Sequence, residues 1–290
     1  MIKLNGILGL APDEPNTGNS FIGAMRDQEL IDEEIATFWL NDKSIGSKVT
    51  FGGFLSESIW GTLYDVKLDT YDNEWWTVDV TRATFGKTRF DNVTKAILDT
   101  GTSFILLTRE DYLTFTEWVV ENLPGVICPD LIGYCTTTEK CSNITESLPH
   151  ITLTIQSTTF TIPAEGYTIT DVSICIIAVS YQEEYSNLYI LGDTFLRNFV
   201  STYDYSRKTV ALGVNINAPE GAKIEKRLLP MEIAGLVIAG ILVLALLILL
   251  LWCICKCARS KKEEDRHAYH KTNEIGQTNW SYPIDTETES

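Results

Sequence analysis

The sequence is poor in basic residues and in histidine. Its 290 residues include 23 Lys and Arg against 39 Asp and Glu, a formal net charge of −16, and only three His. Because binding to nucleic acid depends on Lys and Arg that neutralise phosphates, this balance argues against a nucleic-acid partner. The chain also has no nucleotide motif and no metal-ligand motif, and the Gly52-Gly53 pair is typical of a turn. We therefore predict no cofactor and no metal site.

A convincing secretory signal peptide is also missing. The apolar stretch in MIKLNGILGLAPDEPN is short and is interrupted by Asn5 and Gly6. A single-pass membrane protein whose N-terminal side faces away from the cytosol normally carries such a signal. We therefore expect that the chain lacks its true beginning.

One long run has no charge. Residues Ile233–Cys255 are uncharged over 23 positions, more than the ~20 apolar residues that a bilayer-spanning helix needs. A buried core helix of this length is rare. Basic residues follow the run at Lys256, Arg259, Lys261, Lys262 and Arg266, and fewer precede it, at Lys223, Lys226 and Arg227. The positive-inside bias predicts a type I single-pass protein in the lipid bilayer of the plasma membrane or an endomembrane, with residues 1–232 luminal or extracellular.

The seven cysteines form two groups. Cys128, Cys135, Cys141 and Cys175 precede the apolar run, and Cys253, Cys255 and Cys257 lie at its far end. An even number on the luminal side predicts two disulfides, for which three pairings are possible. A zinc site is the alternative, although no His lies at ligand spacing. The second group, Cys253, Cys255 and Cys257, could be S-palmitoylated or could serve only as small apolar residues at the membrane interface, and the sequence leaves both interpretations open.

Two glycosylation sequons lie on the same predicted luminal side. They are Asn92-Val-Thr94 and Asn143-Ile-Thr145, and each marks a surface position in a secreted domain. A third match, Asn279-Trp-Ser281, falls on the predicted cytosolic side. We predict glycans at Asn92 and Asn143.

The pattern before the apolar run is mainly β, with Gly, Thr, Val and Ile between turn signals. We expect a helix within Ser20–Trp39, a strand at Val49–Gly53, a hairpin within Thr62–Val80, a helix at Arg109–Asn122 capped by Thr108, and strands at Ile151–Ile155 and Phe160–Ile162. A linker over 218–232 leads into a transmembrane helix over 233–255. The polar tail, 256–290, is predicted to be disordered.

The most informative motif is Asp99-Thr100-Gly101-Thr102-Ser103, which follows the apolar residues Ala96-Ile97-Leu98. A buried strand delivers the carboxylate in such an arrangement, and Gly101 allows a tight turn beside it. The tripeptide Ile-Leu-Gly also occurs twice, as Ile7-Leu8-Gly9 and as Ile190-Leu191-Gly192.

With these motifs the chain resembles a pepsin-like aspartic protease from about Asn5 to Val214. Six segments match the family in its order: Gly6–Ala11, Val49–Gly53, Trp75–Asp79, Ala96–Ser103, Cys141–Pro149 with Cys175, and Leu188–Arg197. The resemblance implies a bilobal β fold in which residues 1–60 are the end of the N-terminal lobe and the inter-lobe strand. Residues 61–217 would then form the C-terminal catalytic lobe. Most of the N-terminal lobe would lie upstream of Met1, and a membrane anchor is not a general feature of the family.

The resemblance also assigns roles to individual residues. Asp99 is the second catalytic carboxylate, supported in its loop by Thr100, Gly101 and Thr102. The segment Ile190, Leu191 and Gly192 braces that loop, and Ile7-Leu8-Gly9 would brace the missing first loop. Cys141 pairs with Cys175 by the same resemblance, which leaves Cys128 with Cys135. Asp193 belongs to the bracing strand and is interpreted as structural.

The family's chemistry uses two carboxylates that share one proton and activate a water molecule. This chain supplies one of the two carboxylates. The first hypothesis is therefore an aspartic endopeptidase that acts on peptides, and the enzyme's missing N-terminal lobe would carry the other carboxylate. The alternative is a catalytically inactive, membrane-anchored single-lobe binding protein. A homodimer that pools two Asp99 loops is a further variant, but the extra sequence before residue 60 makes symmetric pairing awkward.

Overall fold

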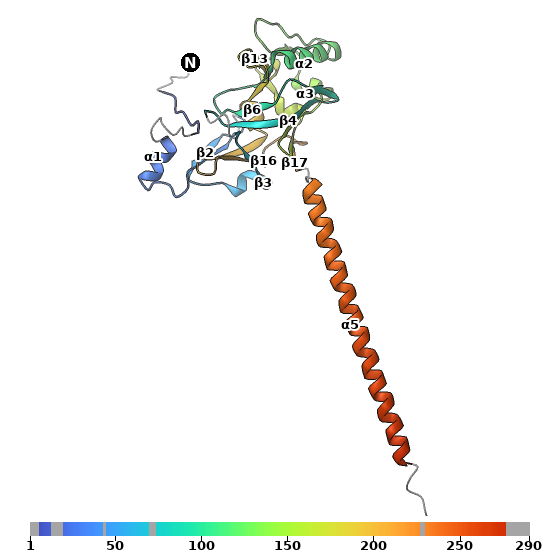
Figure 1. Ribbon diagram of the computed structural model, residues 1–290. Helices are drawn as coiled ribbons and strands as arrows, with labels where there is room; N and C mark the ends of the chain where they lie inside the picture. Colours follow the sequence, from blue (N-terminus) through green and yellow to red (C-terminus); the bar gives the residue numbers. More distant parts are fainter. Residues whose placement is uncertain (1–5, 13–19, 43–44, 70–73, 227–229, 277–290) are drawn as a thin grey trace, which may run out of the picture. The chain divides into compact units, whose positions relative to one another are not determined.

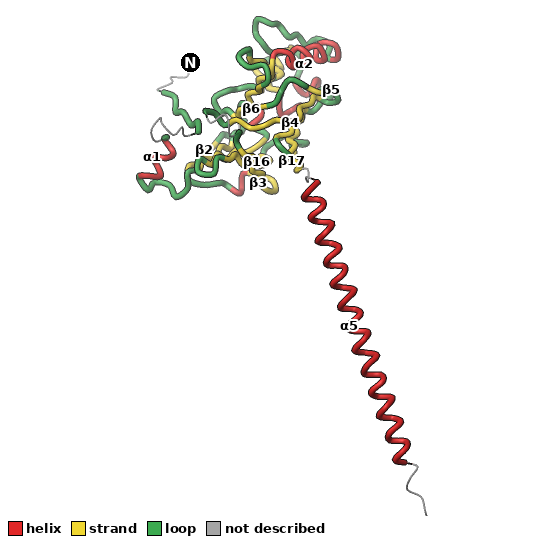
Figure 2. Tube along the Cα trace, in the orientation of Figure 1, coloured by secondary structure: helices red, strands yellow, loops and turns green. Residues whose placement is uncertain are grey.

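The computed structural model describes residues 6–12, 20–42, 45–69, 74–226 and 230–276. The chain divides into two compact units, one up to Arg227 and one from Leu228. The first unit is built mostly from strands and loops (Figure 2), and the described residues of the second form helix α5, Pro230–Gly276 (orange to red in Figure 1). The mainly β class predicted from the sequence is therefore confirmed.

Three sheets make up the first unit. The five-stranded sheet has the order β2 (Lys48–Phe51), β1 (Ile35–Trp39), β15 (Phe199–Asp204), β16 (Thr209–Asn215) and β3 (Ile59–Lys67). The second sheet has the order β13 (Val179–Gln182), β7 (Ile105–Thr108), β14 (Leu188–Leu191), β6 (Lys95–Leu98), β4 (Thr77–Phe85), β9 (Ile151–Ile155), β10 (Thr158–Ile162) and β17 (Lys223–Lys226), and β5 (Thr88–Phe90) pairs with β4. The third has the order β11 (Thr168–Asp171), β12 (Ile174–Ile177) and β8 (Cys135–Thr137).

Four short helices accompany these sheets: α1 (Phe21–Asp27), α2 (Arg109–Asn122), α3 (Cys141–Thr145) and α4 (Asp193–Leu196). Helix α2 has the bounds predicted from the sequence. The Thr108 side chain accepts a hydrogen bond from the Asp111 backbone N–H, which caps the first turn. Its buried face carries Tyr112, Phe115 and Val119, at the spacing of one helical face.

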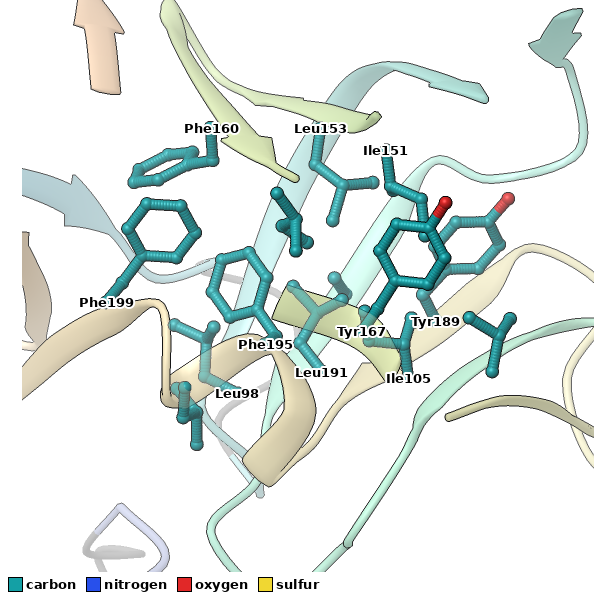
Figure 3. Close-up of a cluster of buried hydrophobic side chains, with 14 of the residues drawn as sticks. Leu98, Ile105, Ile151, Leu153, Phe160, Tyr167, Tyr189, Leu191, Phe195 and Phe199 are labelled. Atoms are coloured by element: carbon teal, nitrogen blue, oxygen red, sulfur yellow. The ribbon is translucent and has the colours of Figure 1, made fainter. Parts of the chain in front are cut away.

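The centre of the second sheet positions the site. Strands β6 and β14 run parallel, with Ile190 opposite Ile97 and Leu191 opposite Leu98. Apart from Lys95 at the start of β6, both strands carry apolar or aromatic side chains, as strands buried on both faces do. In Figure 3, Leu98 and Leu191 lie in one apolar cluster with aromatic side chains, including Phe195. The strand ends that carry Asp99 and Gly192 therefore stand on a packed core.

In the first half of the chain, the helix predicted within Ser20–Trp39 forms but is shorter than that range, and the hairpin predicted within Thr62–Val80 is wrong. The region Ser20–Trp39 contains helix α1 followed by strand β1, because β1 pairs with the distant strand β15. The predicted hairpin within Thr62–Val80 does not form. Strand β3 pairs with β16, and β4 pairs with β6 and β9.

The segments after residue 217 also differ from expectation. The predicted linker over 218–232 contains strand β17, which pairs with β10. Helix α5 covers Pro230–Gly276, so the backbone of the first part of the predicted disordered tail is helical. Lys, Glu, Arg and Ala favour continuation of a helix that is already nucleated. Residues 277–290, with the third sequon match, lie outside the described residues.

Helix α5 contains the predicted membrane span. Its segment Val237–Lys256 has a mean hydropathy of 3.2 over 20 residues, and it is long and apolar enough to cross a bilayer. The expected segment 233–255 begins and ends slightly earlier.

Candidate active site

The carboxylate of Asp99 is held by the turn that follows β6. Its Oδ1 accepts a hydrogen bond of 2.8 Å from the Gly101 backbone N–H, and its Oδ2 accepts one of 2.6 Å from the Thr102 hydroxyl. Bonds of this kind favour the ionised carboxylate and fix its orientation. Asp99, Thr102 and Thr100 are all half-buried, while Gly101 is exposed. The side chain is thus anchored and remains accessible.

The end of β14 clamps this turn. The Asp99 N–H donates to the Leu191 carbonyl at 3.1 Å, the Gly192 N–H to the Phe104 carbonyl at 3.2 Å, and the Asp193 N–H to the Thr102 carbonyl at 2.7 Å. Gly192 lies so close to the loop that a Cβ atom there would be 2.6 Å from the Phe104 carbonyl oxygen. The structure therefore brings Leu191 and Gly192 directly against the Asp99 turn. Ile190 lies one residue before them, in register with Ile97.

The other segment predicted to brace a loop, Ile7-Leu8-Gly9, is largely exposed. Ile7 is 95% exposed and Leu8 is 52% exposed, and a Cβ atom on Gly9 would meet nothing within 4 Å. Leu10 is held, because its carbonyl accepts hydrogen bonds from Trp76 Nε1 at 2.7 Å and from the Tyr205 hydroxyl at 2.8 Å. The apolar side chains of this segment thus have few contacts within the described residues, although its backbone is attached.

A cavity of about 450 Å³ is lined both by the segment 7–11 and by the Asp99 turn. Its walls are formed by Ile7, Leu8, Gly9, Leu10, Ala11, Phe38, Trp75, Trp76, Ile97, Leu98, Asp99, Thr100, Gly101, Tyr203 and Tyr205. Asp99 is the one carboxylate in this lining. The aromatic side chains stabilise the wall by edge-on contacts, with the Trp76 ring 5.0 Å from Tyr203 and 4.9 Å from Tyr205. Sequence reasoning missed this wall because no local pattern brings Trp76 and Tyr205 together.

A second cavity, of about 740 Å³, adjoins the same loop. Ser103 and Phe104 line it, together with Arg197 and Glu165. Thr100 and Gly101 line the first cavity. The first residues of the Asp99 motif therefore face one cavity, and the last residue, Ser103, faces the other. Such a surface suits an extended chain better than a compact small molecule.

Asp193 is the other carboxyl group associated with the loop. Burial raises its pKa above the ordinary value, Arg197 opposes this rise, and the charge of Asp99 adds to it. Asp193 does not line the cavity that contains Asp99. Its position at the start of α4, with its N–H bonded to Thr102, agrees with a structural role.

A buried polar cluster lies behind the loop and was not predicted. The Asp111 carboxylate is 2% exposed and accepts hydrogen bonds from the Tyr189 hydroxyl at 2.6 Å and from Asn92 Nδ2 at 3.0 Å. Tyr189 is in β14, next to Ile190, so the cluster ties α2 to the bracing strand. Asn92 is itself the first sequon residue and is exposed. The second sequon residue, Asn143, is also exposed, and its Nδ2 donates to Glu139 at 3.3 Å.

The four cysteines that precede the apolar segment form two disulfides. Cys128 bonds to Cys135 and Cys141 bonds to Cys175, the pairing that the family resemblance implies. No group of three His, Cys, Asp or Glu side chains that could hold a metal ion is found in the part of the chain that the structure describes.

Comparison with known proteins shows where these features recur. The family model described as eukaryotic aspartyl protease matches residues 1–214. Vacuolar protease A of Arthroderma otae is 32% identical over 218 residues, which cover 72% of this chain and 51% of the relative. Plasmepsin I of Plasmodium falciparum is 30% identical over 218 residues, or 73% of this chain and 46% of the relative. The chain spans about half the length of the curated relatives it matches. Its sequence and its mainly β fold place the chain in the eukaryotic aspartyl protease family.

Proposed function

We propose that this chain is the C-terminal catalytic part of a membrane-anchored aspartic endopeptidase. The observation that carries the proposal is the setting of Asp99. Its two oxygens accept hydrogen bonds from Gly101 and Thr102, and it faces a cavity of about 450 Å³. Both cavities next to the loop leave room for a peptide chain. The pepsin-like family to which the chain belongs supports this class of reaction.

The reaction requires a second carboxylate. When two carboxylates lie about 3 Å apart they cannot both ionise, so one keeps a proton and polarises the peptide carbonyl. The other removes a proton from a water molecule held between them, and that water attacks the carbonyl carbon. The carboxyl group that took the proton from the water passes a proton to the amide nitrogen, and the tetrahedral intermediate breaks at the C–N bond to release an amine and a carboxylic acid, with no covalent acyl-enzyme. Asp99 supplies one member of this pair, and the pair shares its titration.

The surface beside Asp99 supports a missing partner. Ile7, Leu8 and Trp75 are exposed around the cavity, and exposed apolar groups gathered in one place mark interaction sites. A lobe that covers this surface would bury the Ile7-Leu8-Gly9 segment and would carry the second Asp-Thr/Ser-Gly loop. Thr100, which lines the cavity, is then placed to bond across to that loop.

The proposed topology is type I, with residues 1–232 luminal or extracellular and α5 crossing the bilayer. Two disulfides, two exposed sequons and the basic residues after Val237–Lys256 all agree with this orientation. The compartment is a membrane of the secretory or endosomal system, or the plasma membrane. Glycans at Asn92 and Asn143 are part of the proposal.

The second candidate is a binding protein that holds peptides without cutting them. One observation favours it, namely that Asp99 is the single carboxylate in the lining of its cavity. In that case Asp99 has no second carboxylate in the cavity with which to share a proton.

The test uses the full chain purified from membranes, its Asp99→Asn variant, and a library of fluorogenic peptides between pH 3 and 7. Cleavage that Asp99→Asn abolishes while peptide binding persists supports the enzyme. Saturable binding without cleavage, equal in both proteins, supports the binding protein. Sequencing the 5′ end of the native transcript then shows whether an in-frame extension encodes a second Asp-Thr/Ser-Gly. Cleavage whose rate rises with the square of the protein concentration would instead indicate the homodimer.

A further inference from the structure

The cysteines that the structure describes form two groups, disulfides in the first unit and free thiols near the C-terminal end of the apolar segment. Cys128, Cys135, Cys141 and Cys175 form disulfides in the first unit. Cys253 and Cys255 are free and exposed on α5. Disulfides persist in oxidising compartments, and cytosolic thiols stay reduced. A membrane at Val237–Lys256 separates these two environments, which agrees with the proposed topology.

We propose that the free cysteines at this end of the span, Cys253 and Cys255 together with the next one along the chain, Cys257, are S-acylated with long-chain fatty acids. The proposal rests on the topology given under Proposed function and does not depend on catalysis by Asp99. It adds a covalent lipid anchor to a protein that already has a membrane span.

The position of these thiols in the helix suits the modification. The span ends at Lys256, whose ammonium group lies 5.1 Å from the centre of the Trp252 ring. Trp at the end of a span lies at the level of the lipid headgroups, and a basic residue next to it marks the cytosolic boundary. Cys253 and Cys255 therefore lie within one helical turn of the membrane surface, where an acyl chain attached to sulfur can turn back into the hydrocarbon.

Helical geometry places the two thiols on different sides of α5. Two residues along an α-helix correspond to about 3 Å of rise and about 200° of rotation. One acyl chain attached at Cys253 and another at Cys255 would therefore enter the bilayer on opposite sides of the helix. The two chains do not compete for the same space.

The distribution of cysteine in the span argues against apolar filling. The positions from Val237 to Leu251 are Leu, Ile, Val, Ala or Gly, and all three cysteines fall within the five residues 253–257. A cluster confined to the boundary is expected when the thiols themselves react.

The covalent step balances without a change in oxidation state. The cysteine thiolate attacks the thioester carbonyl of a long-chain acyl-coenzyme A, and a new S–C bond forms. The coenzyme A thiolate leaves and takes up the proton that the cysteine gave up. The product thioester is cleaved by neutral hydroxylamine, which restores the free thiol.

The experiment is acyl exchange on the full chain expressed in cells with a secretory pathway. Free thiols are blocked after reduction, thioesters are opened with hydroxylamine, and the exposed thiols are labelled with a polyethylene glycol maleimide that shifts the band once for each acyl group. We expect one to three hydroxylamine-dependent shifts. We expect their complete loss in the triple variant Cys253→Ser, Cys255→Ser, Cys257→Ser and their retention in Cys128→Ser with Cys135→Ser.

Three results would overturn the proposal: no hydroxylamine-dependent shift, shifts that survive in the triple variant, or a disulfide-linked dimer through these cysteines on a non-reducing gel. Removal of N-glycans from the same sample shows whether a negative result comes from a wrong topology or from the absence of acylation. Glycans at Asn92 or Asn143 without acyl shifts mean that the topology holds and acylation is wrong. The Asp99→Asn variant should show the same shifts as the parent, which separates this proposal from peptidase activity.

Discussion

The α-carbon of Gly192 lies against the carbonyl of Thr102, so the end of β14 and the Asp99 turn touch where no side chain can fit. A Cβ atom on Gly192 would overlap that carbonyl and would lie 2.6 Å from the Phe104 carbonyl oxygen. This contact fixes how closely the Asp99 turn approaches the end of strand β14. Glycine is required here for close approach and not for its backbone angle, because its φ is −84°.

Gly192→Ala should therefore destabilise the fold. Overpacking of this kind costs about 1–3 kcal/mol of unfolding free energy, measured by chemical denaturation of the first unit in the full chain. The matched control is Gly9→Ala, since a Cβ atom at Gly9 meets nothing within 4 Å, and we expect a change within about 0.5 kcal/mol. Equal effects from the two variants would show that the contact at Gly192 is not tight.

Tyr189→Phe should weaken the attachment of α2 to the bracing strand. The variant removes the hydroxyl that donates to the buried Asp111 carboxylate at 2.6 Å and leaves Asn92 as its side-chain donor. An under-satisfied buried acceptor costs about 1–3 kcal/mol, read as a lower denaturation midpoint. Tyr134→Phe is the control, because the described residues offer its hydroxyl no hydrogen bond. A Tyr189→Phe protein as stable as the parent would contradict the assigned bond.

Asp193 should make stability depend on pH. Its pKa is raised in the folded state by burial, partly opposed by Arg197, from an ordinary value of 3.8. The stability that this carboxyl contributes is full below pH 3.8 and is lost as the pH rises through the folded pKa. Asp193→Asn removes that loss. The unfolding free energy of the variant minus that of the parent should increase from pH 3 to pH 7, and a difference that stays constant would refute the assignment.

The two disulfides should contribute unequally. Cys141–Cys175 closes a separation of 34 residues and Cys128–Cys135 one of 7. Loop-closure entropy predicts losses of about 4 and about 2 kcal/mol when each pair is replaced by Ser. Thermal or chemical unfolding of the two double variants measures the order, and a larger loss from the short loop would contradict the entropic account.

Both sequons in the first unit should carry glycans if this unit is luminal, as proposed. Asn92 and Asn143 are exposed, and a glycosylated Asn92 keeps one amide hydrogen for its bond to Asp111. Enzymatic removal of N-glycans should shift the parent by two steps and each of Asn92→Gln and Asn143→Gln by one. A parent that does not shift would contradict both the glycans and the luminal placement of this unit.

Local signals predicted some elements closely. Helix α2 begins after Thr108 because its cap, its acidic first turn and its apolar spacing all lie within the segment itself. Strands β9 and β10 follow the alternation visible at Ile151–Ile155. The apolar segment of α5 was evident for the same reason. Each of these elements depends on the physical properties of neighbouring residues.

Elements that depend on distant partners were not predictable in the same way. Ile35–Trp39 is a strand because β15 lies beside it, more than 160 residues later in the chain. Strands β3 and β4 look like a hairpin in sequence, but β3 pairs with β16 in one sheet and β4 pairs with β6 and β9 in another. The attachment of Leu10 to Trp76 and Tyr205, and the burial of Asp111 beneath Tyr189, likewise have no local signal.

For the candidate site, the sequence by itself determined the class of chemistry. Asp99-Thr100-Gly101 supplies a reactive carboxylate on a tight turn, and the order of the surrounding motifs indicates the family. Only the tertiary structure decided how the turn is held, through the clamp of Leu191 and Gly192 and the cavity lined by Ile7 and Trp76. The physical reason is that reactivity follows from residue type and local geometry, whereas close packing and buried hydrogen bonds join residues far apart in the chain, such as Leu10 with Trp76, 66 positions away, and with Tyr205, 195 positions away.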